Sequence, residues 1–291
     1  MMKNYLSEGK FLLYSVLAIF FLMSTHIFQE QINSLYNPEN YVGFHTMLEN
    51  ISICISATIF FYGLKRYRIT RSSQMLLLSF TFFFIGTMDL FHTLTFKGMP
   101  YFITESSVAK ATWFWIIARS GQAILLLPIL LLPDWSLKRD YRIGMLAVAA
   151  VLLSVIIYVV FYFENSLPLL MEDGKGTTPL KNAIEYSISV LQFICLLITL
   201  YHYHEEKCEA KLSIALALVF LLLAELVFTI YRSVYDIDNF VGHIFKTLGF
   251  YYILKGFYFL KNIETMGRQT QRKEPEYQTI SQQKSRTSEV S

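Results

Sequence analysis

Long apolar stretches, separated by short polar segments, fill the chain from residue 11 to residue 260. A helix needs about 20 mostly apolar residues to cross a bilayer, because each residue advances the chain by about 1.5 Å. Eight such windows follow one another, at residues 11–28, 42–64, 74–96, 109–132, 143–163, 181–201, 212–231 and 240–260. The pattern predicts an all-α polytopic integral membrane bundle of about eight transmembrane helices, with boundaries accurate to about four residues.

The remaining residues leave little material for a second domain. Residues 1–10 form a short polar start, and residues 11–260 form the membrane domain. The tail, residues 261–291, is rich in Gln, Ser, Lys and Arg and has no apolar periodicity, which is typical of disorder. The first window follows two lysines, as a secretory signal does. It is long for a signal and lacks a clear cleavage site, so we count it as a span.

Lysine and arginine residues are divided unevenly between the two sides of the predicted bundle. If the amino terminus lies inside, the loops and tail on that side carry most of the cations. The opposite side holds only Lys97, Lys110, Lys175, Lys181 and Arg232. The positive-inside rule therefore places both termini in the cytoplasm and the chain in the cytoplasmic membrane as a multi-pass protein.

Composition supports the same class. Hydrophobic residues make up 54% of the chain and charged residues 16%, and the mean hydropathy is +0.41. The net charge of +3 reflects the inner cations, so we expect no nucleic-acid binding. Cys54 and Cys195 lie within spans and Cys208 lies in a cytoplasmic loop, which excludes a disulfide framework.

Several spans carry ionisable side chains, each of which costs about 2.5–3.5 kcal/mol at the centre of a membrane helix. Such a residue therefore indicates either a polar partner that offsets this cost or a functional role. On five spans they recur at helical spacing with other polar or aromatic residues, namely His45, Glu49, Ser52 and Ser56; Asp89 and His92; Trp115, Arg119 and Gln122; Glu225, Thr229 and Arg232; and Asn239, His243 and Lys246.

The predicted topology brings these residues to one level. His45, His92 and His243 all fall near the outer ends of their helices, and the helical rise places Arg119 about 15 Å below its own outer end. Glu49, Asp89, Glu225 and Lys246 fall within about two turns of the histidines. We therefore predict one polar pocket in the outer leaflet, open to the outside and capped by the KGMP turn that begins at Lys97. Glycines on the facing stripes should allow close helix approach beneath it, namely Gly86, Gly121, Gly242 and Gly249.

The residue types leave several chemistries open. Three histidines with Glu49 or Asp89 suit zinc, copper or non-haem iron, and two histidines on different helices suit axial ligation of a haem. A small organic or redox-active ligand, or proton sensing, is equally compatible. The polar set could also be structural, because one proton balances Glu49, Asp89 and Glu225 against Arg119 and Lys246.

Four segments, FHTMLENISI, MDLFHTLTFKGM, ATWFWIIARSGQ and ELVFTIYRSVYDIDNFVGHIFKTLGFYYI, resemble the third type of membrane-associated sensor domain (MASE type three). The resemblance covers roughly residues 10–260. The positions that match its polar motifs are His45, Glu49, Asp89, His92, Lys97, Gly98, Arg119, Tyr231, Asp236, Asn239, His243 and Lys246. It implies an eight-span sensory module that precedes a PAS domain, a histidine kinase or a diguanylate cyclase in the same polypeptide.

The segment after Leu260 departs from that organisation, because its roughly thirty residues carry no kinase, cyclase or PAS pattern. We therefore expect signalling through a separate cytoplasmic histidine kinase or diguanylate cyclase, or a shortened form of a longer sensor. The lipid bilayer and a second copy of the chain are the other candidate partners.

The expected function is a membrane sensor that binds a metal, haem or small ligand and has no catalytic activity of its own. A transporter or proton-coupled carrier ranks second, because the spans are almost wholly apolar below Arg119. A membrane metalloenzyme with Glu49 or Asp89 as base is the other alternative, and no His-Glu-x-x-His motif supports it.

Overall fold

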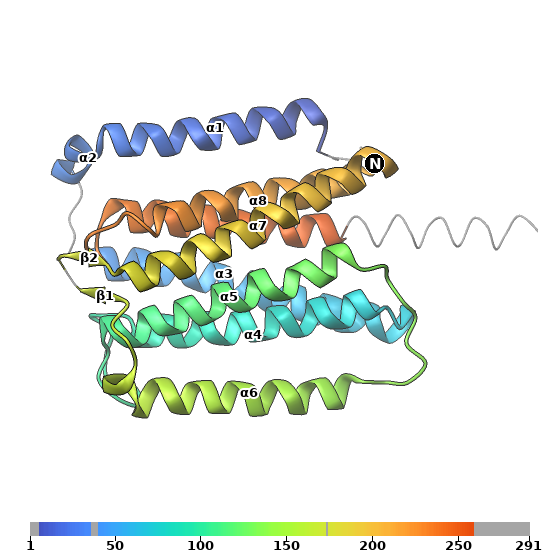
Figure 1. Cartoon of the computed structure of the whole chain (residues 1–291), viewed down its shortest axis with the longest axis horizontal. Helices are drawn as coiled ribbons and strands as arrows, with labels where there is room; N and C mark the ends of the chain where they lie inside the picture. The colour runs from blue at the N-terminus through green and yellow to red at the C-terminus, as the bar shows by residue number, and fades with distance from the viewer. Residues whose placement is uncertain (1–5, 36–39, 173, 259–291) are drawn as a thin grey trace, which may run out of the picture.

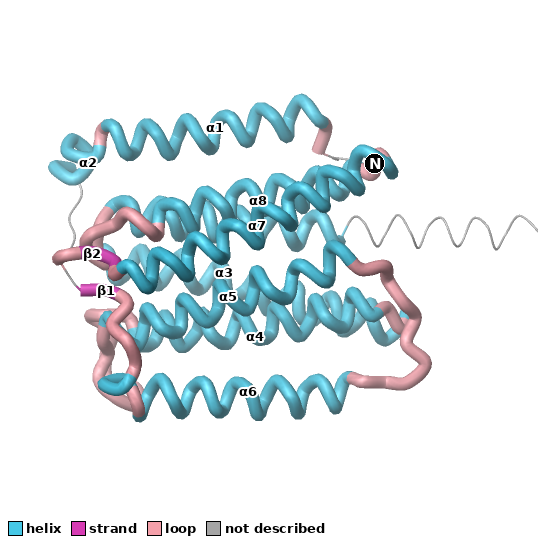
Figure 2. Tube along the Cα trace, in the orientation of Figure 1, coloured by secondary structure: helices cyan, strands magenta, loops and turns pink. Residues whose placement is uncertain are grey.

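The computed structural model describes residues 6–35, 40–172 and 174–258. These residues form a bundle of helices that run side by side along one axis (Figure 1). The bounds of the elements are α1 Glu8–Ile27, α2 Gln29–Leu35, α3 Tyr41–Thr70, α4 Ser73–Thr95, α5 Val108–Leu131, α6 Arg142–Tyr162, a 3₁₀ turn Glu164–Ser166, β1 Met171–Glu172, β2 Gly176–Thr177, α7 Pro179–Glu206 and α8 Glu209–Val227. Residues 237–258 form a further helix. The predicted all-α class is confirmed, and the only strands in the described ranges are the short hairpin β1–β2 (Figure 2).

The predicted spans agree with these helices. Seven helices in the described part are long and apolar enough to cross a membrane: α1, α3, α4, α5, α6, α7 and α8. The eighth predicted window corresponds to the helix of residues 237–258, and its last two positions lie outside the described residues. The predicted tail, residues 261–291, also lies outside them.

Two helices are longer than predicted, because polar residues continue them past their apolar windows. α3 runs to Thr70 through KRYRIT, and α7 runs to Glu206 through YHYHEE. Each stops at a residue in the left-handed conformation, Arg71 with φ 56° and Lys207 with φ 50°. A left-handed residue ends a helix by turning the backbone away from the helical path. Hydropathy alone does not report these ends, because it measures only the apolar part of each helix.

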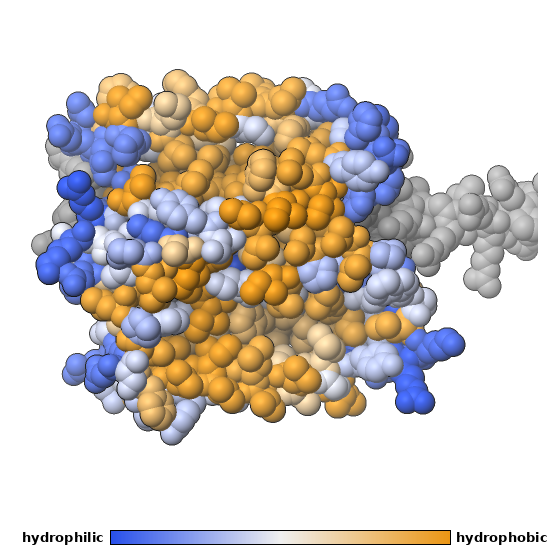
Figure 3. All heavy atoms as spheres, viewed as in Figure 1, coloured by the Kyte–Doolittle hydropathy of each residue, from blue (hydrophilic) through white to orange (hydrophobic). Residues whose placement is uncertain are grey.

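The bundle has a buried centre and two peripheral helices. α4 and α8 are mostly buried, whereas α1 and α6 flank the bundle on opposite edges (Figure 1) and expose most of their surface. Apolar side chains cover the middle of the visible face, and hydrophilic residues gather at both ends (Figure 3). This distribution is the one expected of a protein whose solvent is lipid in the middle and water at both ends.

The four predicted glycine contacts are confirmed. A methyl group at Gly249 would lie 2.8 Å from the Leu221 side chain, and one at Gly86 would lie 3.1 Å from Cβ of Ser56. A methyl group at Gly121 or Gly242 would come closer still, to the rings of Phe84 and Phe228 respectively. Close approach of the helix backbones brings the polar side chains of α3, α4, α5 and the helix of residues 237–258 within reach of one another.

Candidate functional site

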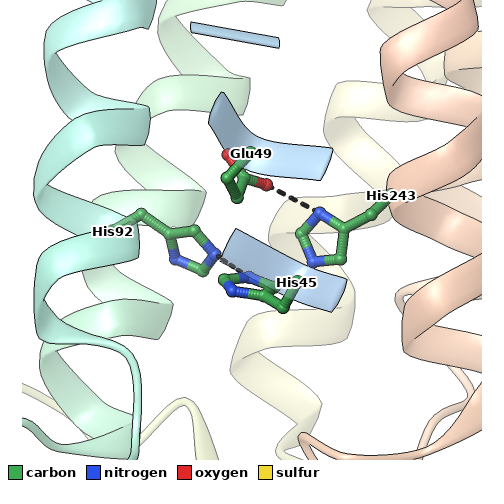
Figure 4. A group of neighbouring side chains, drawn as sticks. All are labelled: His45, Glu49, His92 and His243. Carbon is green, nitrogen blue, oxygen red and sulfur yellow. Dashed lines mark hydrogen bonds and ion pairs between the residues drawn. The ribbon is translucent and has the colours of Figure 1, made fainter. Parts of the chain in front are cut away.

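Three histidines and a glutamate meet inside the bundle. His45 and Glu49 lie one turn apart on α3, His92 lies in the last turn of α4, and His243 lies on the helix of residues 237–258. One ligand atom from each lies within 4.8 Å of the others, and all four residues are buried. Figure 4 shows the four side chains pointing toward one common point. We call these four residues the histidine cluster.

Hydrogen bonds fix the protonation pattern of two of the rings. Nδ1 of His92 lies 2.8 Å from the carbonyl oxygen of Ala111, and a carbonyl only accepts, so this nitrogen carries a proton. In the neutral ring Nε2 of His92 is then a lone pair. It lies 3.1 Å from Nε2 of His45, which therefore donates to it. Nδ1 of His45 is left as a buried acceptor without a hydrogen-bond partner among the described residues.

Glu49 joins the cluster to a cation. Its Oε1 atom lies 2.7 Å from Nδ1 of His243 and accepts a hydrogen bond from Nζ of Lys246 at 2.5 Å. Its Oε2 atom is buried and has no hydrogen-bond partner in the described part of the chain. The cluster thus gathers three ring nitrogens and a carboxylate oxygen around a shared space, with the Lys246 ammonium group at one edge.

Aromatic rings close the cluster from the outside. Phe96 stacks on His45 with 3.9 Å between ring centroids, and Trp115 lies 5.2 Å from His243. Phe228 covers His243 at the same distance. The expectation of a pocket open to the outside is therefore wrong in this structure, because these rings fill the opening. What remains is a cavity of about 20 Å³ lined by His92, His243, Trp115, Phe228 and further residues.

A chain of charges continues from the cluster into the bundle. Nζ of Lys246 lies 3.5 Å from Oδ2 of Asp89, and Arg119 donates to Oδ1 of Asp89 at 2.6 Å. Arg119 also donates to the Gln122 side chain and lies over the Trp115 ring at 4.9 Å. Asp89, Arg119 and Lys246 therefore lie next to the histidine cluster, as predicted, and Lys246 is shared between two carboxylates.

Glu225 belongs to a second buried group. Gln192 of α7 donates to Oε1 of Glu225 at 3.2 Å, and the carboxyl groups of Glu225 and Glu185 interact directly. Lys181 donates to Glu185 at 2.8 Å and to the carbonyl oxygen of Phe228 at 2.8 Å. We call Lys181, Glu185, Gln192 and Glu225 the acid-pair group.

Sequence reasoning missed three members of the acid-pair group, although a signal for them exists. Lys181, Glu185 and Gln192 stand at positions i, i+4 and i+11 of one predicted span, and this spacing places them on one helix face. All three side chains are fully buried.

The remaining predicted residues line or support the site. Tyr231 and Asn239 line the small cavity, and Asn239 donates to the carbonyl oxygen of Val234 at 2.6 Å. The Asp236 carboxylate accepts the backbone N–H groups of Arg232 and Ser233 at 2.8 and 2.7 Å, so it stabilises the turn before the last helix. Nothing in the described residues brings its carboxylate to the histidine cluster. Sequence spacing does not distinguish such a turn residue from a ligand.

Together, the fold and the buried charges define a polytopic helical membrane protein with a site at membrane depth. Polar groups at that depth are costly and usually functional. The family model of the membrane-associated sensor domain (MASE3) matches residues 36–264, and the chain belongs to this family. The matched range includes both buried groups. No curated protein and no solved structure matches the chain.

Proposed function

We propose that this chain is a membrane-embedded sensory input module in which His45, Glu49, His92 and His243 bind one divalent transition-metal ion. The observation that carries the proposal is the approach of four metal-ligating groups to within 4.8 Å in a closed site. A tetrahedral zinc site with bonds of about 2.0–2.1 Å separates its ligand atoms by about 3.3 Å. Small side-chain movements toward the shared centre would therefore suffice.

The surroundings of His92 support this assignment. Histidines that ligate metals almost always donate their other ring N–H to a carboxylate, a carbonyl or water, which fixes the tautomer and the ring orientation. Nδ1 of His92 donates to Ala111 in this way and presents Nε2 to the cluster. When bound, the ion would join three helices at one point.

Cavity size favours a metal ion over a haem or an organic ligand. Pockets for drug-sized ligands measure about 300–1,000 Å³. The cavity beside the histidine cluster measures about 20 Å³, which is enough for a molecule the size of water. Phe96 packs against His45 and Trp115 packs against His243, so these aromatic side chains occupy the space that a porphyrin ring would need.

The interior below the site favours a sensor over a carrier. Buried apolar side chains, among them Phe82, Leu126 and Ile253, fill the bundle between Arg119 and the cytoplasmic ends of the helices. A carrier needs polar groups along both halves of its path. The packing favours a fixed site whose occupancy changes helix positions.

Signalling in this proposal passes to a separate cytoplasmic histidine kinase or diguanylate cyclase. An ion that ligates three helices binds one packing of these helices better than another, and only such a difference shifts their equilibrium. The expected readout is a shift of α3, α4 and the helix of residues 237–258 at their cytoplasmic ends. The chain itself is proposed to have no catalytic activity.

Cobalt(II) is a suitable test ion, because a tetrahedral cobalt site absorbs visible light strongly. The wild-type protein in mild detergent should bind one equivalent with such a spectrum. His92→Ala and His243→Ala should abolish it, and His26→Ala is the matched control because His26 is exposed on α1. Unchanged cobalt spectra in both cluster variants would refute the site, and a wild-type protein that binds neither cobalt nor zinc would refute the metal.

A further inference from the structure

The acid-pair group contains carboxylates whose charges are not balanced locally. Glu185 has one cationic partner, Lys181, on its own helix α7. Glu225, on α8, has a neutral amide partner, Gln192. Both carboxyl groups are buried, and the Glu185 side chain acts on Glu225 through its charge and through a side-chain hydrogen bond.

Three oxygen atoms in this group lack a hydrogen-bond donor. Oε2 of Glu185, Oε2 of Glu225 and Oε1 of Gln192 are all buried and have no partner in the part of the chain that the structure describes. The Gln192 amide is fully buried and directed at Glu225, to which its nitrogen donates. Buried oxygens without a donor are costly, so this arrangement calls for a bound donor or cation.

The charge count of the whole buried network points the same way. Fully or almost fully buried acids are Glu49, Asp89, Glu185 and Glu225, and the corresponding bases are Arg119, Lys181 and Lys246. With neutral histidines, four negative charges face three positive ones. One additional proton makes the described network neutral, and Glu185 and Glu225 are two carboxyl groups of this network that interact with each other.

We propose that Glu185 and Glu225 share one proton and form a proton-binding site separate from the histidine cluster. Two carboxylates in contact at membrane depth cannot both be ionised without a large penalty, so one of them holds a proton. That proton makes one carboxyl a donor to the other, which joins the two unpaired glutamate oxygens in one hydrogen bond. No metal is required, so this site stands independently of the proposed metal function.

Groups on every neighbouring element act on this pair. Lys181 approaches from α7, and Arg119 on α5 acts on Glu225 through its charge. Tyr231 lies under Lys181, with 5.1 Å between Nζ and the ring centroid. The two cations stabilise one negative charge on the pair, and they do not suffice for two because Arg119 is already bound to Asp89.

Infrared spectroscopy of the protein in lipid nanodiscs at neutral pH tests the proposal, because a protonated carboxyl group has its own carbonyl stretching band. The wild type should show this band, and it should shift in D₂O. Glu225→Gln and Glu185→Gln should each remove it. Glu205→Gln is the matched control, since Glu205 is an exposed glutamate of the same helix α7.

Two outcomes would overturn the proposal. The first is a wild-type spectrum without a protonated carboxyl band, and the second is a band that survives in both Gln variants. A missing band together with protection against unfolding by sodium would assign the oxygens to an alkali cation instead. If a Gln variant fails to fold, Gln192→Leu tests the same site, because loss of its hydrogen bond to Glu225 should shift the band frequency.

Discussion

At the scale of single residues, the Asp89–Arg119 pair makes the clearest stability prediction. Both side chains are fully buried. Arg119→Met removes the closer cation of Asp89 and leaves this buried carboxylate with the more distant Lys246 ammonium at 3.5 Å, which Glu49 also binds, so the free energy of unfolding should fall by about 3–5 kcal/mol. The double variant Asp89→Leu/Arg119→Met removes both charges and should recover most of this loss. Denaturant titration in mild detergent measures both.

The matched control for this pair is Arg142→Met, because Arg142 forms an exposed ion pair with Asp140 at 2.6 Å. Surface pairs of this kind contribute little, so the unfolding midpoint should stay unchanged. Equal destabilisation by the single and double variants would show that side-chain packing, and not the buried charge, determines the loss.

Lys246 supports a second prediction at this scale. Its ammonium group donates a hydrogen bond to Oε1 of Glu49 and would therefore compete with a metal ion for that carboxylate. Lys246→Met should therefore raise cobalt affinity by about tenfold or more, which corresponds to ~1.4 kcal/mol. Lys97→Met is the control, because it removes a cation from the exposed outer loop. A lower affinity in Lys246→Met would mean that the lysine holds Glu49 in its binding position.

The histidine cluster could be predicted residue by residue, and the reason is geometric. A helix rises by about 1.5 Å per residue, so sequence position fixes depth once the topology is known. Depth alone brought His45, His92 and His243 to one level. Depth could not show that Phe96 and Trp115 close the opening. The positions of these rings depend on which helices pack against each other, and the sequence alone does not say which helices are neighbours.

At the scale of elements, close helix contacts at glycine make a further prediction. A methyl group at Gly256 would lie 3.2 Å from the backbone oxygen of Ala210 and closer still to the Ile214 side chain. Gly256→Ala should push the last helix away from α8 and cost about 1–3 kcal/mol. Gly144→Ala on α6 meets nothing within 4 Å and should be neutral or slightly stabilising. Thermal unfolding compares the two, and equal midpoints would contradict tight packing at Gly256.

Element boundaries show where sequence patterns stop being informative. Apolar windows located the spans because lipid exposure demands apolar residues on any face it touches. The additional turns of α3 and α7 are polar, and local backbone conformation at Arg71 and Lys207 ends them. Each strand of the β1–β2 hairpin is only two residues long, which is too short to show an alternating pattern of apolar and polar residues.

At the scale of the whole molecule, the predicted orientation can be tested with the native cysteines. Cys208 lies between α7 and α8, at the end where both termini are expected to face the cytoplasm. A membrane-impermeant thiol reagent should label it only after the cells are opened. Cys195 is buried, and Cys54 is exposed on the lipid-facing side of α3 at membrane depth. Neither should therefore react with a water-soluble reagent that does not enter the membrane. If the reagent labels intact cells and Cys208→Ser abolishes this labelling, the topology is the reverse of the predicted one.

The two buried groups belong to one electrostatic network, so their proposed ligands should oppose each other. A divalent ion at the histidine cluster adds two positive charges to a network that one proton already makes neutral. Charges at this depth are poorly screened, so metal binding should expel the proton shared by Glu185 and Glu225. Reciprocity then requires that metal binds more tightly as rising pH removes this proton.

Calorimetry of zinc binding in buffers of different ionisation enthalpy counts the protons released. At neutral pH the wild type should release more protons per metal ion than Glu225→Gln, which has no acid pair to deprotonate. Any proton lost from the histidines contributes equally to both proteins, so the difference isolates the acid pair. Equal release in both proteins would mean that metal binding at the histidine cluster does not change the protonation of the acid-pair group.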